Sequence, residues 1–365
     1  MKNKFKNLLS ISLLAVCTIS CNRDLLTPVP QTSVTDATAF DTPDRILSQL
    51  RGLYTSLKNG NFYGGRYIVY GDIRGEDFIN ETTNLVTGFD VWLLNCVGTS
   101  QNSVKNLWSQ AYYTINNCNL FNDGMAAKGN GVIGSVLGNN YIAESRLIRA
   151  LSYYSLLQFY ARPFTDGAGS KPGLPLRLTG IKGSGYSDLA RSTVAQVYTQ
   201  IIADLDFAEA NLTLNNGTPE LNTTRAHRNT AIALKTRVYL SMANYASVIT
   251  EANKIVAQNT APFSATSGVP HALQANIVNV FTIYNTTESI FSLPMTTTAG
   301  DNPGTQNQLG FYFVSDGGRT PYRLHFRRPS FIYYQAYSEL TQNAMLSDAI
   351  ITMSSLNLIA GELDA

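Results

Sequence analysis

A succession of amphipathic helical patterns between residues 104 and 257 constrains the fold of this chain more than any other feature. Apolar side chains recur there at intervals of three and four residues, which places them on one face of an α-helix. Pro163 ends the second pattern, and Thr193 precedes Gln196 by three residues, the spacing of a capping box at a helix start. The patterns predict helices over residues 104–123, 143–161, 197–212, 231–242 and 248–256, after an earlier helix over residues 44–57.

The last two patterns form a hairpin. Residues 231–257 read as a helix, a turn at Asn244 and Tyr245, and a second helix, which is similar to the helix pair of a tetratricopeptide repeat. One such hairpin has too little area to bury its apolar face alone, so several must stack. An ordinary helical hairpin stays open as the alternative, because strict self-similarity at the repeat length is missing. We therefore predict a mostly α fold of tetratricopeptide-like helical hairpins with an irregular, loop-rich C-terminal part.

The rest of the chain gives weaker signals. Residues 59–88 are rich in Gly, Tyr and Asp without clear periodicity, which predicts a loop. Residues 285–293 indicate a loop that leads into a short strand. A helix over residues 330–346 is only weakly indicated.

The N-terminus has the three parts of a bacterial lipoprotein signal. A basic start precedes an apolar run from Leu8 to Ile19, and the small residue Ser20 stands before Cys21. The apolar run is shorter than the roughly 20 residues that span a bilayer, which disfavours a transmembrane anchor. We predict a signal peptide over residues 1–20, acylation of Cys21, and a Thr- and Pro-rich tether over residues 21–40.

The charge balance excludes nucleic acid as a partner. Loss of Lys2, Lys4 and Lys6 with the signal leaves 24 of the 27 basic residues against 25 acidic ones. Nucleic-acid binding depends on clustered Lys and Arg that neutralise phosphates, and the chain has no such excess. Its 20 Tyr instead suit neutral hydroxylated ligands, because tyrosine combines an apolar face with a polar tip.

No metal or cofactor is expected. His227, His271 and His325 lie far apart in the sequence, with no Cys or carboxylate at ligand spacing. Cys96 and Cys118 are the one disulfide pair available to the mature chain, and two buried thiols are an equally good alternative.

Two further patterns have plain structural interpretations. Residues 129–134 match the GxGxxG string, but no strand precedes them, so we interpret them as a flexible turn between helices. Asp204, Asp206 and Glu209 fall on the polar side of a predicted helix and are interpreted as a solvated face.

The sequence favours binding over catalysis. It contains neither a Gly-x-Ser-x-Gly nor a His-Glu-x-x-His motif. A glycosidase would need two flanking acids, for which Asp72 and Glu76 are the candidates, and loop carboxylates more often bind backbone or ligand hydroxyls.

The candidate ligand site is the polar segment over residues 72–95, which contains a tryptophan among charged and amide side chains. Asp72 and Arg74 precede Asp90, Trp92 and Asn95, a set that offers a flat ring beside hydrogen-bonding groups. Sugars suit such a surface, because their C–H faces pack on an aromatic plane while their hydroxyls pair with polar side chains. The alternative is that Trp92 anchors the core. Trp108, inside a helical pattern, is assigned to the core.

Seven blocks of this sequence, in the same order, resemble the SusD/RagB family. They are the Cys21 tether with Leu25-Leu26-Thr27-Pro28 and Phe40, the helix with Leu53-Tyr54, Tyr70-Gly71-Asp72, the spaced set Trp108, Tyr112, Ile115 and Asn119, and residues 143–154, 191–205 and 231–239. The likeness runs from Cys21 to about Leu293.

The resemblance implies a lipid-anchored protein of the outer membrane, exposed at the cell surface, that captures oligosaccharides or peptides without catalysis. It implies a SusC-like TonB-dependent transporter as partner, for which the protein acts as a lid. In the family, ligand contacts come from the loop after the tether helix and from later loops, which adds Tyr312 to the candidate site residues. A tetratricopeptide-type scaffold that only docks other envelope proteins stays the alternative function.

The domain organisation follows from this resemblance. We expect a SusD-like helical domain over residues 41–320 and an atypical tail over residues 321–365. Residues Tyr322 to Ala365 differ from the C-terminal half of the family, whose members are usually longer. This difference suggests a truncated chain or a tail read out of frame.

Overall fold

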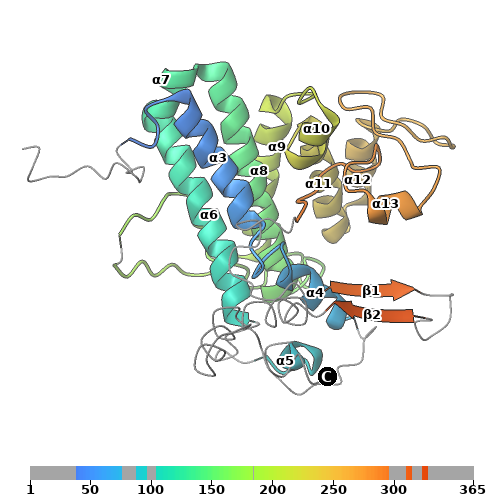
Figure 1. Ribbon diagram of the computed structural model, residues 1–365. Coiled ribbons are helices and arrows are strands. Elements are labelled where there is room, and N and C mark those ends of the chain that lie inside the picture. The colour runs from blue at the N-terminus through green and yellow to red at the C-terminus, as the bar shows by residue number, and fades with distance from the viewer. Residues whose placement is uncertain are drawn as a thin grey trace, which may run out of the picture.

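The computed structural model describes residues 38–75, 88–96, 104–183, 185–295, 310–314 and 323–327. Long helices standing side by side dominate it (Figure 1). These are α3 (Pro43–Leu57), α6 (Asn106–Gly124), α8 (Ser135–Tyr160), α9 (Val194–Asn211), α11 (Arg228–Ser241) and α12 (Tyr245–Asn253). Shorter helical segments are α4 (Arg66–Ile73), α5 (Phe89–Trp92), the π-helical turn η2 (Met125–Gly129), α7 (Asn130–Ile133), α10 (Pro219–Thr224) and α13 (Val278–Thr282).

The long helices pack largely in chain order. Helix α6 lies against α3 and α8, α8 lies against α9, α9 against α11, and α11 against α12. Each helix therefore covers its neighbours in the chain, as stacked helical hairpins do. The prediction of a mostly α fold of tetratricopeptide-like hairpins is confirmed.

The predicted helix starts are formed by side-chain caps. The Thr42 hydroxyl accepts a hydrogen bond from the Arg45 backbone N–H at the start of α3. At the start of α9, the Gln196 N–H donates to the Thr193 hydroxyl at 3.2 Å, while the Gln196 side chain accepts from the Thr193 N–H at 2.8 Å. Each cap satisfies N–H groups that have no partner within the helix.

The core is a continuous cluster along the facing sides of these helices. Residues buried to within 1% exposure include Ile46, Leu50, Leu57, Ile115, Leu147, Ile148, Leu156, Ile201, Leu205 and Val238. Burial of side chains of this size contributes roughly 1.5–3 kcal/mol each, before the cost of chain ordering is subtracted. Trp108 is half-buried and packs against this cluster, with its ring 5.0 Å from that of Tyr160.

Three local predictions are wrong. The expected loop over residues 59–88 contains α4, because Tyr67 and Tyr70 turn inward and pack on the bundle. Residues 129–134 continue the helical path of η2 and α7, and the break comes only at Gly134, where φ is +80°. The segment from Ile290 to Leu293 forms no strand, because the Ser292 N–H donates to the Thr223 carbonyl of the bundle instead.

The solvated face predicted on α9 is also wrong in part. Asp204 is fully buried and accepts two hydrogen bonds from Arg149, at 2.8 and 2.6 Å. A third guanidinium nitrogen of Arg149 donates to the Asn119 side chain at 2.7 Å. The pair is thereby neutralised and hydrogen-bonded, which buried charges require. Of the other two acids, Asp206 is exposed, and the largely buried Glu209 pairs with Lys235 and Lys254.

Beyond the bundle, the structure describes one antiparallel strand pair, β1 (Gly310–Val314) with β2 (Arg323–Arg327). Among the described helices, none combines the length and the apolar character that crossing a bilayer requires. The predicted signal peptide, Cys21, most of the tether and the weak helix over residues 330–346 lie outside the described residues.

Candidate functional site

The candidate ligand surface rests on a cluster of aromatic rings at one end of α8. The Tyr63 ring lies 4.6 Å from that of Tyr67, which lies 5.3 Å from that of Phe159 in α8. The Tyr63 hydroxyl is also hydrogen-bonded to Ser155 at 2.8 Å. These contacts attach α4 firmly to the bundle, so the residues that end α4 have a fixed base.

Two predicted site residues lie at this end of α4. Asp72 and Arg74 both expose their side chains. The Arg74 guanidinium lies over the Phe159 ring, 4.9 Å from its centroid, which orients the side chain while its N–H donors stay accessible. The pair is therefore available to a ligand at the surface.

Helix α5 packs closely against α4. Gly88, at a φ of +84°, stands where a Cβ would come within 2.9 Å of the Tyr70 ring and 3.0 Å of Ile73, so only glycine fits this junction. Asp90 is 6% exposed, and its carboxylate accepts from the Val91 backbone N–H at 3.0 Å. Burial, with a further contribution from Asp90, raises the pKa of Tyr70 to about 12. Asp90 therefore faces the junction between the two helices rather than solvent.

Trp92 and Asn95 complete the predicted set. The Trp92 ring is half-buried and stacks on Phe89, with centroids 6.0 Å apart and planes 25° apart. Asn95 is exposed, and its backbone N–H donates to the Asp90 carbonyl at 3.0 Å. Contact between α4 and α5 thus brings together five of the predicted residues, which lie in these two adjoining helices or directly after them. The sixth, Tyr312, lies in β1 opposite His325 of β2, in strands of which only the backbone is described.

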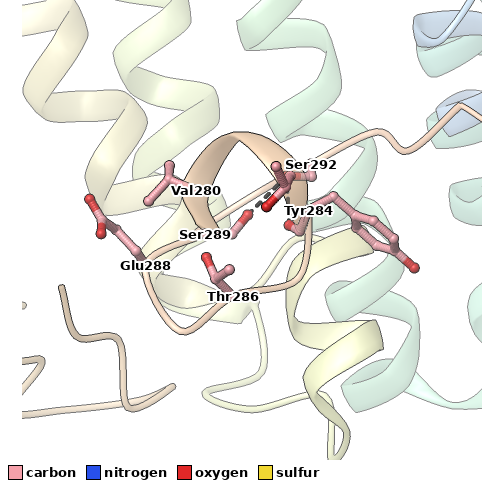
Figure 2. A pocket seen from close by; sticks show the side chains of 7 residues that line it. Val280, Tyr284, Thr286, Glu288, Ser289 and Ser292 are labelled. Carbon is pink, nitrogen blue, oxygen red and sulfur yellow. Dashed lines mark hydrogen bonds between the residues drawn. The ribbon is translucent and has the colours of Figure 1, made fainter. Parts of the chain in front are cut away.

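The structure contains a pocket that the sequence did not predict (Figure 2). It has a volume of about 380 Å³ and is lined by Val280, Thr282, Tyr284, Thr286, Glu288, Ser289 and Ser292. The sequence signal that could have found it is the run of hydroxyl and acidic residues from Thr286 to Ser289.

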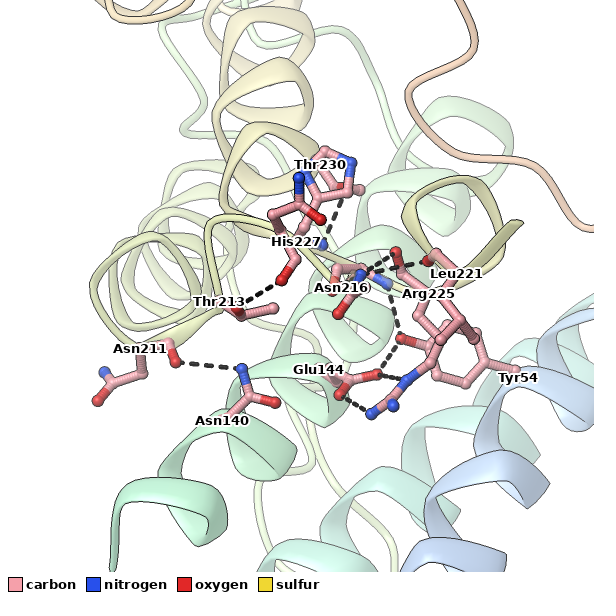
Figure 3. A network of polar contacts seen from close by, with 12 residues as sticks. Tyr54, Asn140, Glu144, Asn211, Thr213, Asn216, Leu221, Arg225, His227 and Thr230 are labelled. Atoms are coloured by element: carbon pink, nitrogen blue, oxygen red, sulfur yellow. Dashed lines mark hydrogen bonds and ion pairs between the residues drawn. The ribbon is translucent and has the colours of Figure 1, made fainter. Parts of the chain in front are cut away.

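A buried polar network lies inside the bundle (Figure 3). Tyr54 donates to Glu144 at 2.6 Å, Arg225 donates to the same carboxylate, and the Ala226 N–H donates to the Tyr54 oxygen at 3.0 Å. Burial raises the pKa of Glu144, and Arg225 opposes this shift. The network joins α3, α8 and the end of α10, elements far apart in the sequence.

Two of the three histidines meet in space, although they lie far apart in the sequence. The His227 and His271 rings stack with centroids 5.3 Å apart, and both residues are buried. Burial lowers the pKa of both, and the neighbouring ring helps to bring that of His227 to about 4. No third metal-binding residue joins them among the described residues.

No disulfide joins Cys96 and Cys118 in the described structure. Cys118 is buried in α6, where burial raises the pKa of its thiol to about 12, and Cys96 is exposed beyond α5. The sequence left open either a disulfide or two buried thiols. The structure shows a buried thiol at Cys118 and an exposed one at Cys96.

Residues 28–240 match the family described as SusD-like, starch-binding and associating with the outer membrane. A SusD superfamily protein of Bacteroides fragilis is 32% identical, with a TM-score of 0.62 over 71% of this chain and 57% of that protein. A laminarin-binding SusD-like protein has a TM-score of 0.54 at 18% identity, a likeness of fold alone. The SusD-like protein P25 of Formosa agariphila is 26% identical over 80% of this chain and 52% of its own length.

A second family matches the C-terminal part. Residues 234–365 match the 49 kDa subunit of respiratory-chain NADH dehydrogenase. An NADH-quinone oxidoreductase subunit of Cytophaga hutchinsonii is 71% identical over 62 residues, which are 17% of this chain and 16% of that protein. The matched range begins inside α11, which packs with α9 in the SusD-like bundle.

This second match includes the atypical tail. Residues 322–365 lie wholly within the range that matches the 49 kDa subunit family. Whether the chain is truncated or its tail is read out of frame stays a prediction.

The chain spans about a sixth of the oxidoreductase relative and about half of the SusD-like ones. The SusD-like match, in contrast, covers more than half of this chain and coincides with the helical bundle. The family expected from the sequence is therefore confirmed, and the chain belongs to the SusD-like family of starch-binding proteins that associate with the outer membrane.

Proposed function

We propose that this protein binds oligosaccharides at the cell surface and delivers them to a SusC-like TonB-dependent transporter, without catalysing a reaction. Membership in a starch-binding, outer-membrane family supports this function. In the proposal, the lipid on Cys21 holds the protein at the membrane. Peptides are the second ligand class that such a surface would accept.

The observation that carries the proposal is the surface made by α4 and α5. Trp92 offers a half-exposed ring, and Asp72, Arg74 and Asn95 place exposed hydrogen-bonding groups on the same two elements. A flat ring beside such groups matches the two faces of a sugar. In this surface Asp90 would act by holding the α4–α5 junction.

The function predicts a specific effect of Trp92→Ala. We expect isothermal titration calorimetry of the mature protein with laminarin and starch oligosaccharides to show binding that this variant weakens at least about tenfold, since an aromatic anchor contributes about 1.4 kcal/mol or more. Tyr186→Ala is the matched control, because Tyr186 is a fully exposed ring elsewhere. An unchanged affinity in Trp92→Ala would remove the α4–α5 surface from the proposal.

A tetratricopeptide-type scaffold is the competing function, because stacked helical hairpins also serve protein docking. It predicts that the wild-type protein retains no oligosaccharide at all. The short match to the NADH-quinone oxidoreductase protein does not favour a respiratory function, because it spans only 16% of that protein.

A further inference from the structure

We infer that the pocket lined by Val280, Thr286, Glu288, Ser289 and Ser292, called here the α13 pocket, is a second binding subsite for a neutral sugar. The inference rests on the proposed function and adds a site apart from the α4–α5 surface. Thr282 and Tyr284 complete the lining of its 380 Å³. That volume lies within the roughly 300–1,000 Å³ typical of small-molecule sites.

The inner wall of the α13 pocket is fixed to the helical bundle. The Ser292 N–H donates to the Thr223 carbonyl at 2.9 Å. The adjoining Phe291 ring lies 6.2 Å from that of Tyr54, whose hydroxyl belongs to the buried network with Glu144. These contacts with the bundle hold Phe291 and Ser292 in place.

The outer wall is tied to α10. The Tyr284 hydroxyl donates to both carboxylate oxygens of Glu220, at 2.7 and 2.8 Å. Asn285 donates to the same carboxylate at 3.3 Å. The hydrogen bond to the Glu220 carboxylate raises the pKa of Tyr284.

Residues 271–274 hold the middle of the lining segment, at Thr287 and Glu288. The Ala272 N–H and the Gln274 side chain donate to Thr287, at 3.2 and 2.6 Å, and the His271 ring lies 3.2 Å from the Thr287 carbonyl. The Gln274 N–H donates to Glu288 at 2.8 Å. The lining segment is thus held at three places before a ligand arrives, which reduces the entropy cost of binding.

The lining favours a neutral polyol over a charged ligand. Five of its seven residues carry hydroxyls, which both donate and accept, and none carries a positive charge, which disfavours phosphates and carboxylates. Glu288 is the one carboxylate, and one of its oxygens already accepts from Gln274. A bound cation needs acceptor groups only, whereas the hydroxyls that line this pocket can also donate hydrogen bonds.

One group in the pocket lacks the partner that a sugar hydroxyl would supply. The Thr286 hydroxyl oxygen is buried without a hydrogen-bond partner among the described residues. Ser289 and Ser292, by contrast, are hydrogen-bonded to each other at 2.9 Å, and Figure 2 shows all three side chains directed into the same space. An unsatisfied buried hydroxyl costs on the order of 1–3 kcal/mol. A change of the Thr286 χ1 rotamer would turn this oxygen towards a hydroxylated ligand, which would then supply the missing hydrogen bond. Val280 adds an apolar contact for the C–H face of the ring.

The test is calorimetric titration with laminaritriose and maltotriose in the background of Trp92→Ala. We expect residual binding in that variant, weakened about three- to tenfold by Thr286→Val, because one hydrogen bond contributes about 0.5–1.5 kcal/mol. Ser289→Ala should act in the same direction. Thr250→Val, at an exposed threonine of α12, is the matched control, and circular dichroism checks that each variant is folded.

The outcomes separate the two proposals. If the wild type binds and neither Thr286→Val nor Ser289→Ala changes the titration, the subsite is overturned and the proposed function stands. If the wild type binds no saccharide, both fail. Tight binding of a simple amine such as cadaverine, lost on Glu288→Gln, would overturn the neutral-sugar assignment in favour of a cation site.

Discussion

Asp204 shows how much one buried charge contributes to this fold. The carboxylate is fully buried and accepts hydrogen bonds from Arg149 and from Gln200, the latter at 3.1 Å. Without Asp204, the guanidinium would stay buried and uncompensated, and groups of that kind are costly in a low dielectric.

We therefore expect Asp204→Asn to lower the free energy of unfolding by about 3–5 kcal/mol, as when one partner of a buried ion pair is removed. Urea denaturation followed by circular dichroism measures this. Asp206→Asn, two residues further along α9, is the control: its carboxylate is 58% exposed, and the loss should stay under about 1 kcal/mol. Equal losses in the two variants would show that burial of the pair is not the cause.

The stacked histidines predict a pH dependence of stability. The unfolded chain takes up a proton at His227 near pH 6.5, whereas the folded chain resists until about pH 4. The stabilising contribution is therefore complete above pH 6.5 and is lost as the pH falls towards 4. The lowered pKa of His271 acts in the same direction.

Replacing His227 by Gln should remove this dependence. Between pH 7 and pH 4.5 we expect the wild type to lose about 2–3 kcal/mol more than the variant, since a tenfold change in proton affinity corresponds to about 1.4 kcal/mol. Chemical denaturation at the two pH values gives both numbers, and the acids that titrate in both proteins cancel in the comparison. Parallel losses would mean that the imidazoles do not control acid stability.

At the scale of elements, helix starts are set locally and helix partners are not. Thr193 and Gln196 form their capping box from four consecutive residues, so the sequence alone revealed it. Helix α4 shows the opposite case. Its aromatic side chains follow no strong pattern. Its position depends on contacts of Tyr67 with Phe159 and of the preceding Tyr63 with Ser155, each 92 residues later in the chain.

Thr193→Ala should cost about 1 kcal/mol of stability, the usual effect of losing an N-cap side chain. The matched control is Thr199→Ala in the same helix, where the exposed hydroxyl only bonds back to the Ala195 carbonyl. Thermal melts of the two variants provide the comparison. If Thr199→Ala is as damaging as Thr193→Ala, the box contributes nothing particular.

At the scale of the whole molecule, the proposal places the bundle on a lipid anchor. Export and acylation depend on the signal and on Cys21, which precede the described residues. Apolar residues of α3, α6, α8, α9 and α11 meet in one core cluster.

Cys21→Ala should release the protein from the membrane. We expect the wild type to fractionate with outer-membrane vesicles and the variant to appear in the soluble fraction, because stable attachment needs acyl chains that only the cysteine accepts. Cys17→Ala is the control and should fractionate as the wild type does. Membrane retention of Cys21→Ala would refute lipid anchoring at this residue.

The sequence by itself determined the succession of amphipathic helices, their caps and, through ordered local blocks, the family. These features depend on residues within a turn or two of one another, where spacing fixes which face is apolar. Only the tertiary structure decided that Asp204 is buried and that His227 meets His271. Each of these depends on groups that folding brings together from different helices and loops. The spacing of residues along the chain does not show which of these groups come into contact.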